Sequence, residues 1–298
     1  MENIISVKNL SKSFGGVEVV HDLEFDVKKG EIFAFVGPNG SGKTTTIRCL
    51  LKIYQADRGD LKVFGEEYSV SLAPKLGYLP EERGLYVSAN VLDTMIYFGM
   101  LKGMKRGMAR DAALDYLARV GLLEKATQKI QKLSSGQQQK IQLGIAIINS
   151  PELLILDEPT KGLDPVNRQL LMDILFELNK SGSTIVFLTH QMDEVEKIAN
   201  RLLMINKGMK SLYGEVNEVR SQFGLNTIHL YYQGEFKPNP DLFESKVEGQ
   251  YAELTPRPKV THDEILTYLV KLNMSIEKYE VAAPSLNEIF INVVGAEK

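Results

Sequence analysis

The segment 37–44, GPNGSGKT, limits the possible folds of this chain more than any other, because it fits the phosphate-loop pattern G-x-x-x-x-G-K-[ST] throughout. It follows an uninterrupted apolar run at 32–36, typical of a central parallel strand, and precedes a helical pattern at 45–51. In that setting the glycines let backbone N–H groups converge, and the helix N-terminus adds about half a positive charge. The sequence therefore predicts an α/β fold that binds the phosphates of a nucleotide.

Two side chains of this loop have expected chemical roles. Lys43 is expected to reach the β- and γ-phosphates, and the Thr44 hydroxyl is expected to hold Mg²⁺. Kinases, GTPases, helicases and transport ATPases all use such a loop, so the class stays open at this point. GTP is disfavoured, because the nearest match to a guanine-reading Asn-Lys-x-Asp element has Met209 in place of the aspartate.

Polar residues end two further apolar runs of the sequence. Asp157 and Glu158 follow the run at 153–156, and His190 lies just beyond the run at 184–188. Buried parallel strands deliver such residues to the ligand edge of a sheet. Asp157 is then expected to bind Mg²⁺, directly or through water, and Glu158 to accept a proton from an attacking water. His190 is expected to hydrogen-bond a γ-phosphate and to respond to its loss.

A serine and a glycine in the segment 133–137, LSSGQ, precede an apolar helix predicted at 140–148. Taken alone, the segment is an ordinary N-cap or a second anion site at a helix N-terminus. The order of the phosphate loop, LSSGQ, the acidic pair, the Gly-Leu-Asp of 162–164 and the Thr-His of 189–190 resembles the nucleotide-binding subunit of ABC transporters. The resemblance covers residues 1 to about 220, and LSSGQ is its most specific part.

This resemblance implies an ATPase that uses ATP and Mg²⁺. It implies an α/β P-loop NTPase core of the ABC type at 1–220, with a mixed sheet plus a helical subdomain at about 85–150, and a small C-terminal α+β domain at 221–298. It assigns nucleotide binding to Phe14, Gly37, Pro38, Asn39, Gly40, Ser41, Gly42, Lys43, Thr44, Thr45, Ser134, Gly136 and Asp164. It assigns catalysis to Lys43, Glu158 and His190, and the metal to Thr44, Asp157 and Glu81.

The resemblance also implies how the chain assembles. Phe14 resembles the aromatic residue that stacks on adenine, and Asp164 belongs to the D-loop. Ser134 and Gly136 resemble signature residues that touch the γ-phosphate of the opposite subunit. No candidate arginine finger is evident, so charge on the transferred phosphoryl group must be met by other donors. The N-termini of two helices can neutralise this charge only if each helix comes from a different copy in a head-to-tail dimer. This implies an ATP-dependent homodimer.

Two positions depart from the family's usual pattern. Glu81 stands where the Q-loop normally has a glutamine. A carboxylate there can bind the metal or accept hydrogen bonds from its water shell, yet it adds negative charge beside the phosphates. Ser135 replaces a glycine of the signature segment.

The last part of the chain indicates which kind of ABC ATPase this is. The stretch 80–85, PEERGL, and the added C-terminal domain look like ATPases of ABC-2-type exporters, including bacterial sodium-extruding and drug-export systems. Capping boxes at 261–264 and 285–288 predict two helices, the second similar to the closing helix of their accessory domain. The implied partner is an ABC-2-type permease. The alternative is an ABC-type ATP switch that regulates a non-transport partner.

Composition bears on the remaining partners. A formal net charge of −3 gives no global basic field, so nucleic acid is not expected as a partner. No apolar run approaches the ~18 residues that would span a bilayer, so we expect membrane contact only through the permease. The resemblance then implies a cytoplasmic chain, peripheral on the cytoplasmic face of the cell membrane.

Overall fold

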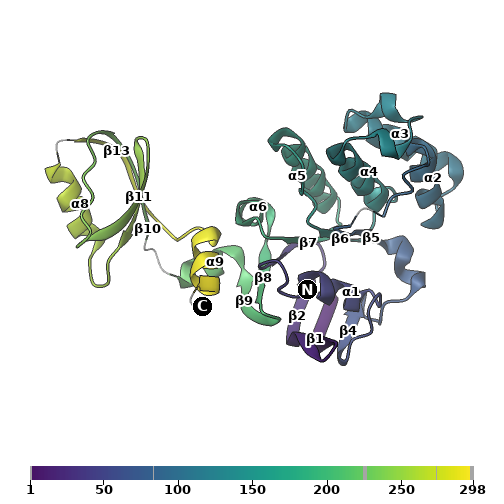
Figure 1. Cartoon of the computed structure of the whole chain (residues 1–298), viewed down its shortest axis with the longest axis horizontal. Helices are drawn as coiled ribbons and strands as arrows, with labels where there is room; N and C mark the ends of the chain where they lie inside the picture. Colours follow the sequence, from purple (N-terminus) through teal and green to yellow (C-terminus); the bar gives the residue numbers. More distant parts are fainter. Residues whose placement is uncertain (1, 83, 224–226, 273, 296–298) are drawn as a thin grey trace. The chain divides into compact units, whose positions relative to one another are not determined.

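The computed structural model describes residues 2–82, 84–223, 227–272 and 274–295 of the 298-residue chain. It divides the chain into an N-terminal unit, Met1–Glu215, and a C-terminal unit, Val216–Lys298 (Figure 1). The N-terminal unit contains a mixed sheet, a smaller antiparallel sheet and helices, so the expected α/β class is confirmed. None of the described helices is both long enough and apolar enough to cross a bilayer.

A six-stranded sheet forms the centre of the N-terminal unit, in the order β5-β6-β7-β3-β8-β9. In chain order its strands are β3 (Ile32–Val36), β5 (Leu76–Leu79), β6 (Leu153–Asp157), β7 (Thr184–Thr189), β8 (Arg201–Asn206) and β9 (Met209–Glu215). All pairs are parallel except β8 with β9. Every residue of β3, β6 and β7 is buried, as their apolar runs predict. The carboxyl ends of these strands share one edge of the sheet, which positions the site.

A three-stranded antiparallel sheet shares a core with this centre. In it β1 (Asn3–Phe14) lies between β2 (Val17–Lys28) and β4 (Arg58–Val63). Phe25 of β2 packs on Phe33 and Phe35 of β3, with ring centroids 6.0 and 5.6 Å apart. Helix α1 (Lys43–Leu50) buries apolar side chains in the same core. The helix that follows the phosphate loop is thereby held in place by apolar packing.

Helices occupy the region expected at about 85–150. The three longest are α2 (Val91–Leu101), α3 (Arg106–Arg119) and α4 (Ser135–Ile147), which lie together in Figure 1. Short 3₁₀ turns are η1 (Val70–Lys75), η2 (Leu123–Lys125) and η3 (Ile130–Lys132), and α5 (Pro165–Lys180) and α6 (Met192–Ile198) follow β6 and β7. The predicted start of the α4 helix at 140 was wrong, because Ser134 and Gln137 form a capping box that starts it earlier.

Close packing joins α3 to α4. The Tyr116 hydroxyl donates to the backbone carbonyl of Lys140 at 2.6 Å. At Gly144 the two helices approach so closely that an added Cβ would lie 2.3 Å from Cε1 of Tyr116. Glycine at this point of α4 therefore avoids a clash with Tyr116.

The C-terminal unit contains a four-stranded antiparallel sheet in the order β11-β12-β10-β13. Its elements are α7 (Val216–Gln222), β10 (Thr227–Gly234), β11 (Phe243–Glu248), β12 (Tyr251–Pro256), α8 (His262–Lys271), β13 (Met274–Ala282) and α9 (Leu286–Gly295). The sheet and α8 bury a core of their own, separate from that of the N-terminal unit. Both predicted capping boxes are present, since Thr261 exchanges hydrogen bonds with Glu264, and Ser285 with Glu288.

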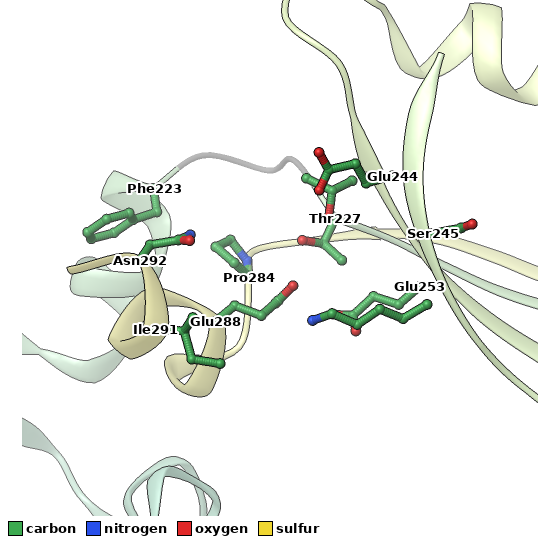
Figure 2. Close-up of a pocket in the computed structure, with 11 residues that line it drawn as sticks. Phe223, Thr227, Glu244, Ser245, Glu253, Pro284, Glu288, Ile291 and Asn292 are labelled. Atoms are coloured by element: carbon green, nitrogen blue, oxygen red, sulfur yellow. The ribbon is translucent and has the colours of Figure 1, made fainter. Parts of the chain in front are cut away.

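A cavity of 390 Å³ lies within this unit (Figure 2). Figure 2 shows Glu288 and Ile291 of α9 on one side and Glu244 and Glu253 of the sheet on the other. Burial raises the pKa of Glu253, and a hydrogen bond with the Glu288 carboxyl raises it further. The side chains of Glu253 on β12 and Glu288 on α9 thus both line this cavity.

Candidate functional site

The phosphate loop needs glycine at two positions for steric reasons. Gly37 has a φ of 153°, and an added Cβ would lie 2.2 Å from the carbonyl oxygen of Ile205. Gly42 has a φ of 105°, and a Cβ there would lie 3.0 Å from the carbonyl oxygen of Val19. The backbone therefore curls tightly between β3 and α1. No described side chain caps the N-terminus of α1, so its backbone N–H groups are available to an anion.

A cavity of 370 Å³ lies over this loop, lined by Val19, residues 39–45, Glu81, Asp157 and Glu158. The Lys43 side chain is buried, and its Nζ donates to the carbonyl oxygens of Gly37 and Pro38 at 2.7 and 3.0 Å. Burial lowers the pKa of Lys43, while three nearby carboxylates act in the opposite direction. A buried ammonium group at the floor of an anion cradle suits the binding of phosphate.

Thr44 and Asp157 meet at this cavity. Thr44 Oγ1 donates a hydrogen bond of 2.8 Å to Asp157 Oδ2. Burial raises the pKa of Asp157 to about 6, and the bond from Thr44 opposes this rise. Hydroxyl and carboxylate oxygens are the hard ligands that Mg²⁺ prefers, usually together with phosphate oxygens. The residues present therefore fit the Mg²⁺ that the family resemblance implies.

Glu158 and His190 lie side by side just beyond the ends of β6 and β7. The distance from Glu158 Oε1 to His190 Nδ1 is 2.8 Å. The second carboxylate oxygen, Oε2, is buried and has no hydrogen-bond partner among the described residues. Glu158 also has a φ of 49°, a left-handed conformation that costs energy for a residue with a side chain. Strain and an unpaired buried oxygen together are typical of a functional carboxylate.

The third predicted metal ligand, Glu81, lies in the loop after β5 and lines the same cavity. Its Oε1 accepts a hydrogen bond of 2.7 Å from Lys161 Nζ. The structure therefore brings Glu81 to the metal candidates Thr44 and Asp157, and adds a lysine that the sequence analysis missed. An isolated lysine after the acidic pair carries no pattern from which this contact could have been predicted.

The signature residues lie apart from the phosphate loop of the same chain. Ser134 is the N-cap of α4, its Oγ accepts from the backbone N–H of Gln137, and its side chain is exposed. Gly136 lies in the first turn of α4, where an added Cβ would be 3.5 Å from Leu163. Neither residue is among those that line the 370 Å³ cavity. Within one chain, the predicted nucleotide ligands therefore form two separate groups.

Gly37, Pro38 and His190 are adjacent to lining residues without being among them, whereas Phe14 and Asp164 lie outside the cavity lining at the ends of other elements. Phe14 is the last residue of β1, 43% exposed, and its ring meets that of Tyr54 edge-on at 5.3 Å. Asp164 is the N-cap of α5 and accepts from the backbone N–H of Asn167 at 2.9 Å. This bond is the largest cause that lowers the pKa of Asp164.

Sequence reasoning also missed two buried glutamines of α4 that connect the site. Gln139 Nε2 donates to the carbonyl oxygen of Pro159 at 3.0 Å, directly after Glu158. Gln142 Nε2 donates to the carbonyl oxygen of Glu82 at 3.3 Å, directly after Glu81. The helix that begins with the signature segment is thereby attached to both acidic loops of the cavity. The three-residue spacing of Gln139 and Gln142 places both on one face of a helix, but this spacing does not reveal what they contact.

The fold and the site together define a P-loop ATPase with a separate signature helix. Residues 20–161 match the family model described as "ABC transporter", and residues 214–294 match "ATP-binding protein DrrA1-3-like, C-terminal domain". The ABC transporter ATP-binding protein YhaQ of Bacillus subtilis (strain 168) is 34% identical over 296 residues, covering 98% of this chain and 99% of the relative. The chain belongs to the family of ABC transporter ATP-binding proteins, and it is an ATPase.

Further comparisons agree with this family. Nod factor export ATP-binding protein I of Paraburkholderia xenovorans (strain LB400) is 31% identical, covering 99% of this chain and 98% of the relative. A solved structure titled "Structure of ATP binding subunit of ABC transporter" superposes with a TM-score of 0.70 at 26% identity. It covers 74% of this chain and 93% of the other. These matches confirm the expected ABC ATPase core. They also confirm that the chain is similar to ATP-binding proteins of exporters.

Proposed function

We propose that this chain binds Mg-ATP in the cavity over its phosphate loop, hydrolyses it, and powers export by a separate ABC-2-type permease. Lys43 exchanges its bonds to the carbonyls of Gly37 and Pro38 for bonds to phosphate oxygens. Thr44 and Asp157 hold Mg²⁺, with Glu81 as a third candidate ligand. The metal, when bound, neutralises charge on the phosphates.

The environment of Glu158 carries the hydrolytic part of this proposal. His190 Nδ1 lies 2.8 Å from one carboxylate oxygen and orients the group, while the other oxygen is buried with no described partner. An unpaired carboxylate oxygen beside the phosphate cavity suits a base that accepts the proton of an attacking water. His190 is half exposed, so its ring is also accessible to a γ-phosphate.

ATP-dependent dimerisation accounts for the separation of the signature from the phosphate loop. The N-terminus of α4 is exposed, and its backbone N–H groups form a second anion-binding end. In a head-to-tail homodimer, Ser134 and Gly136 of one copy meet the phosphates held by the other, with Asp164 near the same boundary. Phe14 adds stacking on the adenine at the rim. Two identical chains then enclose two nucleotides.

The relatives support an export role. Nod factor export ATP-binding protein I carries export in its name and covers nearly the whole chain. We infer that this chain works at the cytoplasmic face of the cell membrane, attached through its permease. The alternative, a switch that regulates a non-transport partner, has no specific observation in its favour.

A pull-down followed by transport measurement tests this proposal. The tagged chain is purified from native membranes, and inside-out vesicles that contain the captured complex are assayed for ATP-dependent uptake. We expect a membrane-spanning partner to co-purify, and uptake to disappear in the Lys43→Ala variant. ATP turnover without any membrane partner would contradict the export role and favour the switch.

A further inference from the structure

A lysine outside the phosphate loop forms an ion pair with a carboxylate that lines the nucleotide cavity. Lys161 Nζ lies 2.7 Å from Glu81 Oε1, and Glu81 lines the cavity. The backbone N–H of Lys161 donates to the Glu158 carbonyl at 3.2 Å, so Lys161 belongs to the turn that follows the proposed base. The ion pair therefore connects the loop after β5 to the turn after β6.

The cavity carries more acidic than basic groups before any nucleotide enters. Three carboxylates line it, those of Glu81, Asp157 and Glu158, against the single ammonium group of Lys43. Glu81 and Glu158 both raise the pKa of Asp157, after the larger effect of burial, so the carboxylates repel one another. Phosphate oxygens bring further negative charge. A carboxylate at position 81 is therefore unfavourable for phosphate binding unless a cation neutralises it.

Lys161 is suited to supply that cation. The hydrogen bond and ion pair with Glu81 raise the pKa of Lys161 most. The charges of Glu158 and Asp157 raise this pKa further. Its side chain is 63% exposed, so the pair contributes little to folding. Neutralising the charge of Glu81 beside a bound phosphate is the effect that remains.

We propose that Lys161 is a positioning residue that neutralises Glu81 and so permits a carboxylate beside bound phosphates. The inference rests on the proposed function, in that the phosphates of ATP occupy this cavity. Lys161 acts through Glu81, and it is not among the residues that line the cavity. Its contribution disappears when position 81 carries no charge.

A double-mutant cycle tests this inference. The variants are Lys161→Met, Glu81→Gln and their combination, with Lys161→Arg as the conservative replacement. The Kd of a fluorescent ATP analogue is measured with and without Mg²⁺, and melting curves report folding. Lys62→Met is the matched control, because Lys62 also forms an exposed ion pair, at 2.8 Å with Asp60, away from the cavity.

We expect Lys161→Met to raise the Kd about fivefold, the upper range for an exposed ion pair, and more without Mg²⁺. In the Glu81→Gln background the same change should alter the Kd less than about twofold, because no charge is left to neutralise. Lys161→Arg and Lys62→Met should bind like the wild type. If Lys161 had a purely structural role, Glu81→Gln would not restore the affinity that Lys161→Met loses.

Two results would overturn the inference. One is a Lys161→Met protein that binds as tightly as the wild type. The other is a Lys161→Met change that lowers the affinity equally whether position 81 carries Glu or Gln. Failure of the wild type itself to bind nucleotide would instead overturn the proposed function, and Lys43→Ala provides the reference for that outcome.

Discussion

Replacing Glu158 with glutamine removes the proposed base and leaves its surroundings nearly unchanged. The amide oxygen can keep the contact that Glu158 Oε1 makes with His190 Nδ1 at 2.8 Å. The amide nitrogen then takes the place of Oε2, which has no described hydrogen-bond partner, so no existing bond is broken. We therefore expect the free energies of folding and of ATP binding to change by less than about 1 kcal/mol.

The rate of ATP hydrolysis should change far more than folding or ATP binding in the Glu158→Gln variant. General base catalysis contributes about 10²- to 10⁴-fold in rate. This factor corresponds to about 3–5 kcal/mol of activation free energy. Glu158→Gln should lower kcat by that factor and should accumulate an ATP-bound dimer, because release of the two copies would follow hydrolysis.

Three measurements separate these effects. Phosphate release at saturating Mg-ATP gives kcat, calorimetry gives ATP affinity, and light scattering gives the mass of the complex. Glu82→Gln is the matched control, because Glu82 is 85% exposed and is not among the residues that line the cavity. Turnover by Glu158→Gln within about threefold of the wild type would refute the assignment of the base.

Three further predictions concern binding, pH and packing. Lys43→Ala should weaken Mg-ATP binding at least about tenfold by calorimetry, since charge-assisted hydrogen bonds to phosphate are lost, and unchanged affinity would contradict its role. The pKa of Asp157 is raised to about 6 and only the ionised carboxylate binds metal, so the affinity gained from Mg²⁺ should fall as pH drops through about 6. Asp157→Asn should lack this pH dependence, and an identical profile in both proteins would argue against Asp157 as the titrating ligand. Gly144→Ala should lower the free energy of unfolding by about 1–3 kcal/mol. The reason is that its Cβ would lie 2.3 Å from Tyr116 Cε1, and an unchanged Tm would show that α3 and α4 pack less closely.

Local sequence patterns predicted the elements that surround the site. The apolar runs mark β3, β6 and β7, because strands buried on both faces need apolar residues throughout. Two glycines of the phosphate loop, Gly37 and Gly42, mark positions where an added Cβ would crowd a backbone carbonyl oxygen. These signals are local, so they can be read without knowledge of the tertiary structure.

Other features depend on contacts that no local pattern specifies. Lys161 and Glu81 are 80 residues apart in sequence, and the pairing of β5 with β6 brings their loops together. The start of α4 was misjudged because its first residues, SGQQQK, are polar and carry no apolar periodicity. Capping by Ser134, rather than hydrophobic spacing, fixes that boundary.

Cross-linking between two copies tests the shared nucleotide site most directly. Asn39→Cys lies at an exposed position of the phosphate loop, and Ser135→Cys lies beside Ser134 at the exposed start of α4. Both are introduced into Glu158→Gln protein in which the buried Cys49 is replaced by alanine. We predict a cross-linked dimer that forms with saturating Mg-ATP and is absent without nucleotide. Protein that binds ATP yet never joins these two positions would contradict a nucleotide held between the phosphate loop of one copy and the signature of the other.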